Sequence, residues 1–281
     1  MKLKFIKILF FLCSFVFSSV SFGNAKTYDN CILNGLKNVT SDLIAKQIIK
    51  SCENKYSKSV STENKAAKLP KITFIEIGHS KKWKIPVPAG NYIKTADRTD
   101  YGQTVPRTYQ IYENIENGKL KHLLWVSFTK SQNPNMWRAS KTCNRRDLHF
   151  INKVANNRAG KQECNIVNHW RMTGGVKNKY RNHAWALAAE DAKKWHTLNN
   201  VSIPNTMIIA QSIFANYNRL EVRVKFNPEL EGFPPTVDSN WSSNDWHQDK
   251  IIGDKKRQEY IEKVKVFAID MHNKIKPQFK W

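Results

Sequence analysis

Strict alternation of apolar and polar residues predicts β-strands late in the chain. Leu220, Val222, Val224 and Phe226 alternate with charged residues, which is the pattern of a strand with one buried and one solvated face. An apolar segment at 207–214 lies just before it. Together the two segments predict a β-hairpin.

A second strand-rich part lies at residues 71–130, where we predict a meander of about five strands. Its clearest element is a hairpin with arms at 109–113 and 120–129, joined around Asn117-Gly118. Asparagine followed by glycine is the strongest short signal for a two-residue hairpin turn. On one face of the second arm we expect Leu120, His122, Leu124, Val126 and Phe128.

Apolar residues at intervals of three or four predict two helices. One covers about residues 183–196, and the other begins after Asp254, a favoured N-cap, and ends before Pro277. The order of the elements favours an α+β fold, with antiparallel strands in a meander and a second hairpin packed with helices. The apolar side of the final helix carries Ile261, Val264, Ala268, Met271 and Ile275.

The first 25 residues have the pattern of a signal peptide. Three lysines precede an apolar run at 8–20, and small residues suit cleavage near Gly23 or Ala25. The run is about 13 residues long, whereas a membrane-spanning helix needs roughly 20. We therefore expect a soluble protein that is periplasmic or secreted after cleavage, with no transmembrane segment in the mature chain.

Residues 26–56 predict a small helical hairpin that carries two cysteines. Residues 57–68 have no apolar periodicity and predict a linker. We therefore place the main α+β domain at residues 69–281.

The mature chain has four cysteines, an even number that favours disulfides in an oxidising compartment. Three pairings are possible in principle. Each local pair is separated by 21 positions, and this equal spacing favours a Cys31–Cys52 bridge and a Cys143–Cys164 bridge.

The chain is strongly basic, with 46 lysines and arginines against 23 acidic residues and a net charge of +23. After removal of residues 1–25, 43 basic residues remain and the net charge is +20. Such a balance favours an anionic partner, for example a nucleic acid or an anionic surface of lipid headgroups or glycans. A general bias towards lysine is the alternative explanation, because no long basic block occurs.

Candidate chemistry is concentrated at residues 143–169. Cys143 and Cys164 with His149 and His169 form a ligand set that suits tetrahedral zinc. Thiols in an oxidising compartment favour a disulfide instead, so we expect no metal here. If this stretch has only a structural role, we predict that it is a loop or short helix closed by the disulfide. The candidate site residues are Asp147, His149, Asn157, Arg158 and His169.

The sequence DLH at residues 147–149, followed by Asn156 or Asn157 and by Arg158, resembles a DLH…N…R stretch in periplasmic endonucleases of the endonuclease I type. In that family a histidine serves as general base and an asparagine helps to hold one Mg²⁺ near the scissile phosphate, so the resemblance implies a Mg²⁺-dependent nuclease. The interval from the aspartate to the asparagine is shorter here, and no Glu-His pair precedes the segment.

Three segments resemble an uncharacterised group of exported bacterial proteins with paired cysteines. They are CILNGLKNVTSDLIAKQIIKSCENKY, the central CNRRDLHF…QECNIVNHW, and RLEVRVKFNPELEGFPP through SNWSSNDWHQDKI. No activity is attached to that group, so the resemblance implies export and domain limits and no mechanism.

These observations favour an exported basic protein that is non-enzymatic, needs no cofactor and binds an anionic or envelope partner. The alternative is a Mg²⁺-dependent nuclease or other hydrolase that uses the segment from Asp147 to His149. An enzyme should place His149 in a cleft beside a second histidine or a carboxylate. A purely structural segment should pack His149 against loop backbone.

Overall fold

The computed structural model describes residues 48, 51, 70–78, 82–101, 105–130, 137, 140–158, 161–172, 182–238 and 240–279, without the side chains of Lys130 and of residues 153–158. The chain divides into two compact units, Met1–Lys65 and Ala66–Trp281. The predicted signal peptide, the hairpin with Cys31 and Cys52 and the linker lie outside the described residues, apart from Ile48 and Ser51 in a helical segment. The second unit contains the sheet and its helices.

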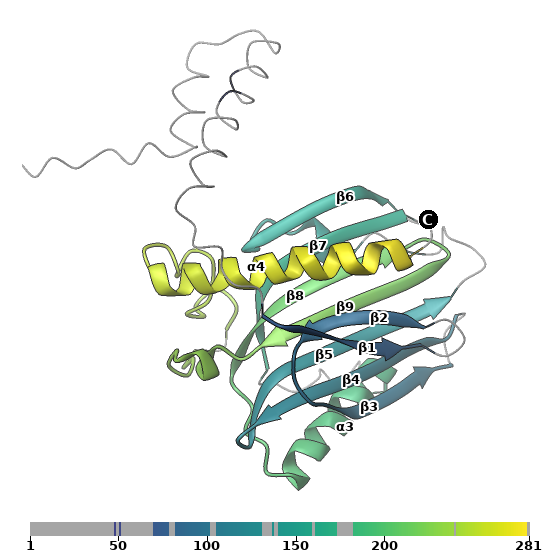
Figure 1. Cartoon of the computed structure of the whole chain (residues 1–281), viewed down its shortest axis with the longest axis horizontal. Coiled ribbons are helices and arrows are strands. Elements are labelled where there is room, and N and C mark those ends of the chain that lie inside the picture. The colour runs from purple at the N-terminus through teal and green to yellow at the C-terminus, as the bar shows by residue number, and fades with distance from the viewer. Residues whose placement is uncertain are drawn as a thin grey trace, which may run out of the picture. The chain divides into compact units, whose positions relative to one another are not determined.

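Seven antiparallel strands form the main sheet of this unit (Figure 1). Their order across the sheet is β3-β4-β5-β9-β8-β7-β6, so that the last strand in sequence lies at the centre. With its two helices, the sheet confirms the α+β class. The strands are β3 (Tyr92–Asp100), β4 (Arg107–Glu116), β5 (Lys119–Lys130), β6 (Phe150–Arg158), β7 (Lys161–Arg171), β8 (Thr206–Ala215) and β9 (Asn218–Phe226).

A separate two-stranded sheet precedes the main one. It consists of β1 (Ile72–Ile77) and β2 (Trp83–Pro88). Five strands therefore occur where we predicted them, but the prediction of a single meander is wrong, because only β3 to β5 form one. Trp83, Ile85 and Val87 of β2 are buried in the same core as helix α4, so this hairpin covers one face of the main sheet.

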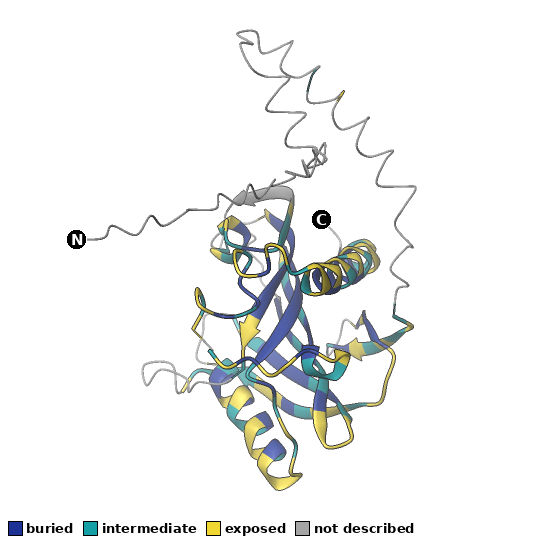
Figure 2. Ribbon diagram, turned by 90° about the vertical axis from the view of Figure 1, so that its left-hand side faces the viewer, coloured by how far each residue is buried: buried dark blue, intermediate teal, exposed yellow. Residues whose placement is uncertain are grey.

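Two helices cover opposite faces of the main sheet (Figure 2). Helix α4 (Lys255–Ile275) packs against β2, β7 and β8, and helix α3 (Ala184–Leu198) packs against β3 and β4. The Asp254 carboxylate accepts a hydrogen bond from the Arg257 amide at 3.0 Å, which confirms the predicted N-cap. All five predicted apolar residues of α4 are buried, and none of the described helices is long and apolar enough to cross a membrane.

The predicted hairpin at Asn117-Gly118 joins β4 and β5. Both residues have positive φ angles, 51° for Asn117 and 71° for Gly118, as a two-residue turn of this type requires. The predicted second hairpin is also present, as β8 and β9. The prediction of a solvated face on β9 is wrong, because Glu221 and Lys225 on that face are buried.

A β-bulge interrupts β5 just after this turn. Asn114 pairs with His122 but Ile115 pairs with Leu120, so Lys121 is an extra residue on β5. The prediction that Leu120 shares a face with His122 is therefore wrong. Leu120 is buried on the α3 face, whereas Leu124 and the later alternate residues face α4.

The stretch around the central cysteines is mostly strand, so the prediction of a loop or short helix is wrong. Only a short 3₁₀ turn, η2 (Thr142–Asn144), precedes β6 and β7. Eight consecutive residues of β7, from Gln162 to His169, are buried, and five of them are polar. This burial on both faces removes the alternation that would have identified a strand.

The predicted Cys143–Cys164 disulfide is present and ties η2 to β7. Its Cα atoms are 6.0 Å apart, which is ordinary disulfide geometry. Both cysteines are fully buried with Leu148, Ile166 and Ile213, so the bridge anchors the segment that leads to His149.

Replacing both Cys143 and Cys164 with alanine should lower the free energy of unfolding by about 3 kcal/mol, because a bridge across a loop of this length restricts the unfolded chain by roughly that amount. Denaturant unfolding without reductant measures the difference. Reductant should destabilise the wild type by more than the double variant, since the variant has already lost this bridge. Equal stability of the two proteins would contradict the role of the disulfide.

Candidate functional site

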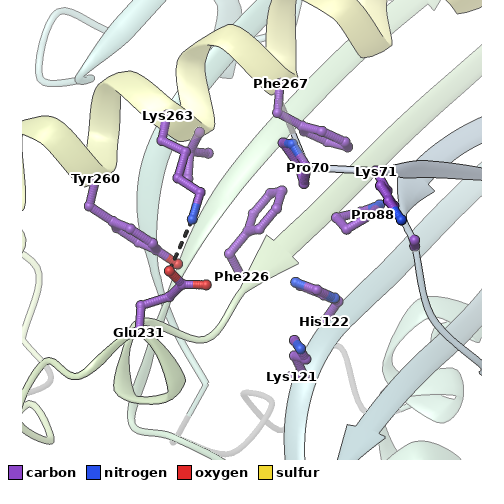
Figure 3. Close-up of a pocket in the computed structure, with 12 residues that line it drawn as sticks. Pro70, Lys71, Pro88, Lys121, His122, Phe226, Glu231, Tyr260, Lys263 and Phe267 are labelled. Carbon is purple, nitrogen blue, oxygen red and sulfur yellow. Dashed lines mark hydrogen bonds and ion pairs between the residues drawn. The ribbon is translucent and has the colours of Figure 1, made fainter. Parts of the chain in front are cut away.

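A cavity of about 260 Å³ lies between α4, the ends of β5 and β9, and the β1–β2 hairpin (Figure 3). We call it the α4 pocket. Tyr260 and Lys263 reach into it from α4, while His122 and Phe226 approach from the strands. It is lined by Pro70, Lys71, Pro88, Ala89, Lys121, His122, Phe226, Glu231, Tyr260, Lys263, Val264 and Phe267.

Aromatic rings form the apolar part of the pocket wall. Phe226 and Phe267 pack edge to face with ring centroids 5.1 Å apart, a favourable arrangement for two aromatic rings. Tyr260 is 7% exposed. Burial raises the pKa of Tyr260, and Glu231 raises it further, so its hydroxyl stays protonated and the wall carries no aromatic charge.

Three lysines and one carboxylate line the pocket. The Lys263 ammonium is 3.0 Å from Glu231, which comes from the 3₁₀ turn η4 (Pro228–Glu231). Lys121 pairs at 2.7 Å with Glu116, which does not line the pocket. Lys71 is exposed at the rim. The lining therefore has an excess of positive charge.

His122 is a half-buried polar residue of the lining with one enclosed nitrogen. Its Nδ1 atom is excluded from solvent and has no hydrogen-bond partner, while its ring packs edge to face on Phe226 at 5.4 Å. Burial, together with the positive charges of Lys121 and Lys263, lowers the pKa of His122 to about 3. The imidazole is therefore neutral at pH 7, with an unsatisfied buried nitrogen, which is unusual in native proteins.

The bulge in β5 brings Lys121 and His122 to the pocket together. Neighbouring residues of a regular strand point to opposite faces, but the extra residue at Lys121 breaks this rule. Asn227, at the end of β9, holds the bulge, because its amide group donates to the Leu120 carbonyl and its backbone N–H donates to the Lys121 carbonyl. No role for His122 was predicted from the sequence, although a histidine on an otherwise apolar strand face was a usable signal.

The candidate residues predicted in the central stretch lie away from this pocket. The Arg145 guanidinium holds the carboxylate of Asp147 and lowers its pKa to about 2, and Trp241 Nε1 donates to the same carboxylate at 2.9 Å. Arg145 also lies over the Trp241 ring at 3.9 Å. Asp147 thus links the disulfide loop to the segment that carries Trp241.

His149 and His169 come together, as the candidate set implied, and His247 joins them. The ring centroids of His149 and His169 are 6.1 Å apart, and those of His169 and His247 are 5.8 Å apart. We call these three residues the histidine cluster. Burial lowers the pKa of His149 and of His169 to about 4 each. Sequence reasoning missed His247 because it lies in an irregular segment far along the chain.

His149 also lines a second cavity, of about 400 Å³, on the other flank of α4. Its polar lining includes Gln248, Gln258 and Glu262. His149 therefore lies in a cleft beside a second histidine, as expected of a chemical site, although a backbone hydrogen bond at Trp246 also holds it.

The structure shows less support for the other residues that were predicted as a site. Asn157 and Arg158 lie in β6, and their side chains are outside the described part of the structure. Cys143 and Cys164 are oxidised, which removes their sulfurs as metal ligands. Among the described residues, no group of three or more His, Cys, Asp or Glu side chains is placed to hold a metal ion as it stands.

Comparison with protein-family models, curated proteins and solved structures gives no match for this chain. The resemblance to exported proteins with paired cysteines therefore stays a prediction. The chemistry of both sites follows from their geometry alone.

Lowering the pH from 7 to 5 should destabilise the protein through its buried histidines. The pKa values of His122, His149 and His169 lie below the ordinary value of 6.5. Below pH 6.5 the unfolded chain therefore binds more protons than the folded chain. The free energy of unfolding decreases as the pH is lowered. At pH 5 the loss is on the order of 2 kcal/mol for each histidine.

Urea unfolding at a series of pH values measures this loss. A His149→Gln variant should show a shallower dependence between pH 5 and 6.5, by about one proton taken up on unfolding. His183→Gln serves as a control outside both sites. If the His149→Gln variant keeps the slope of the wild type, His149 is not held neutral in the folded protein.

Proposed function

We propose that this protein binds small anionic molecules with an apolar body in the α4 pocket. The observation that carries the proposal is the combination, in one cavity, of an aromatic wall, three lysines and the unpartnered Nδ1 of His122. An apolar pocket with a few convergent polar groups and a perturbed pKa is the usual form of a ligand site. A turn of the His122 ring about χ2 brings the unpartnered nitrogen to the cavity, where a ligand supplies the hydrogen bond that it lacks, and the lysines favour negative charge.

The volume limits the ligand to a small molecule. About 260 Å³ is the space of roughly nine water molecules at ~30 Å³ each, and lies just below the usual range for drug-sized ligands of about 300–1,000 Å³. A short acyl chain or a single aromatic ring that carries a carboxylate fits these dimensions. A polymer such as a nucleic acid could enter only by one terminal group.

The export of the protein belongs to the same proposal. We expect residues 1–25 to direct secretion and a Cys31–Cys52 bridge to close the hairpin at 26–56. The net charge of +20 after cleavage would draw anionic molecules towards the protein. The proposed role is binding without catalysis, because the pocket offers one neutral imidazole and no nucleophile paired with a base. The nuclease-like alternative keeps His149 as its candidate base, but the Asp147 carboxylate is already engaged by Arg145 and Trp241.

Octanoate should bind the purified protein more tightly than its uncharged analogue octanol, because the lysines favour the carboxylate. The dissociation constant of octanoate should therefore be the lower of the two. Lys71→Gln and Lys121→Gln should each weaken octanoate binding by about 2- to 5-fold, as expected for exposed charges. Ala89→Trp, at the exposed lining position, should fill the cavity and abolish binding. Isothermal titration calorimetry measures all of these changes.

The matched control is Lys255→Gln, which removes the same charge from the exposed first turn of α4. It should leave octanoate affinity unchanged within the error of the titration. The proposal fails if octanol binds as well as octanoate, or if Ala89→Trp binds octanoate normally.

His122→Phe should have opposite effects on stability and binding. Removal of an unsatisfied buried nitrogen should raise the free energy of unfolding by about 1 kcal/mol. The loss of its hydrogen bond to the ligand should weaken octanoate binding by about 2- to 10-fold. Denaturant unfolding and calorimetry on the same variant measure both effects. Unchanged affinity would show that His122 does not contact the ligand.

A further inference from the structure

Three arginines on the α3 side of the sheet share one carboxylate, that of Glu221 in β9. The carboxylate lies 3.0 Å from the Arg107 guanidinium, 3.8 Å from that of Arg219 and 2.5 Å from that of Arg223. It accepts four hydrogen bonds, one of them from Gln211, and four is about the full capacity of a carboxylate. One negative charge is therefore divided among three positive ones.

The positive charge of this cluster is incompletely neutralised. Asp100 lies opposite Arg107 on the edge strand β3 and offsets at most one further charge. The Nε atoms of Arg107 and Arg219 are excluded from solvent and have no hydrogen-bond partner, and burial lowers the pKa of Arg219. The side chains of Arg107 and Arg223 are 23% and 21% exposed, so an anion from solvent reaches them. Charge-assisted hydrogen bonds to these guanidinium groups stabilise such an anion.

Two tryptophans lie beside the same arginines. The Arg223 guanidinium lies over the Trp125 ring at 4.3 Å and over the Trp170 ring at 5.2 Å, and both are cation–π contacts. Trp170 is 37% exposed, whereas most of a tryptophan side chain is usually buried. Its ring is therefore open to a planar group from solvent. We call Arg107, Arg219, Arg223, Trp125 and Trp170 the arginine–tryptophan face.

The sheet fixes this face without any ligand. Trp125 of β5 pairs directly with Arg223 of β9, and the rings of Trp125 and Tyr109 pack 5.6 Å apart. Arg107 donates to the Ser127 hydroxyl at 2.7 Å. The side chains thus have little freedom to lose when a ligand binds, which favours affinity.

The chain around the two tryptophans has long stretches without acidic residues. Residues 117–146 contain seven lysines and arginines and no aspartate or glutamate, and residues 164–189 contain four and none. Charge of one sign attracts a polyanion from solution and raises its rate of association. The sequence near this face therefore suits a partner with repeated negative charges.

We propose that the arginine–tryptophan face binds single-stranded nucleic acid. Guanidinium groups bind phosphates through charge-assisted hydrogen bonds, and an exposed tryptophan ring stacks on an unpaired base. The bases of a duplex stack on one another and do not reach Trp170, so a single strand is favoured. The face lies on the opposite side of the sheet from the α4 pocket, and no ligand is needed there.

Fluorescence anisotropy with a labelled oligothymidylate of about 12 nucleotides tests the proposal on the purified protein. Arg223→Gln should weaken binding and reduce the slope of log K against log salt by about 0.7, the value for one phosphate contact on a single strand. Trp170→Ala should weaken binding by about 5-fold or more through the loss of stacking. It should leave the salt slope unchanged, because it removes no charge.

Two matched controls lie outside this face. Phe74→Ala removes an exposed aromatic ring from β1, and Lys255→Gln removes an exposed charge from α4. Both variants should bind oligothymidylate as the wild type does. A duplex of the same length should bind more weakly than the single strand at the same salt concentration.

A measurement on the wild type covers the case in which a variant does not fold. Ultraviolet crosslinking to an oligonucleotide that contains 5-iodouracil, followed by mass spectrometry, should place the adduct at Trp125 or Trp170. The proposal is overturned if the adduct lies outside the arginine–tryptophan face, or if the duplex binds as tightly as the single strand. It is equally overturned if folded Trp170→Ala keeps the affinity of the wild type.

Discussion

The packing of helix α4 on the sheet is the contact on which both candidate sites depend. Its buried side inserts Val264, Phe267 and Met271 into the core formed by β8 and β9. The residues on either side of this apolar stripe then face the two cavities, Lys263 in the α4 pocket and Glu262 in the other. An amphipathic helix buries only one face in the hydrophobic core, so the residues on its two flanks are available for function.

Buried charges fix how the helix and the strands meet. Near the C-terminal end of α4, His272 lies 3.0 Å from Glu163 of β7, and Lys276 pairs with the same carboxylate at 2.8 Å. On the opposite face of the sheet, burial alone would raise the pKa of Glu221, but three arginines outweigh it and hold the value at about 2. A buried carboxylate without such partners is strongly destabilising, so these contacts select one strand register and one helix position. The arginines are Arg107, Arg219 and Arg223.

The sequence predicted the elements in which apolar and polar positions recur with a regular period. Helix α4 was found with its buried residues, because solvent enforces the polar positions between the apolar ones. Strand β9 was also found from its alternation, but its polar positions Glu221 and Lys225 are buried, and ion pairs with arginines, not solvent, keep Glu221 charged. β7 was missed because Asn165 and Asn168 are buried on opposite sides of the strand with apolar neighbours, and the pattern then carries no period. The bulge at Lys121 was missed because Leu123, Leu124, Trp125 and Val126 are all apolar, so the pattern does not show which residues of β5 share a face. Pairing across strands shows it, and a single sequence does not contain that information.

The residues of the candidate sites also fall into two groups, those that could be predicted from the sequence and those that could not. His149 and His169 were identified because reactive residue types crowd together in the central stretch. His247 and the α4 pocket depend on segments that meet only in the folded protein, such as the end of β2 and the middle of α4. A search along the chain finds local clusters, whereas a pocket built from five elements has no local pattern.

The bulge in β5 has a consequence for how the fold tolerates change. Leu120 faces α3 and His122 faces α4, so these two residues would alternate correctly if Lys121 were absent. The strand is thus one residue longer than its two cores require, and the surplus residue is the one that carries a charge to the pocket. Lineages could gain, lose or exchange this cation by a single-codon insertion or deletion, with every core residue of β5 still facing its own side. The charge at this edge of the α4 pocket can therefore change independently of the fold.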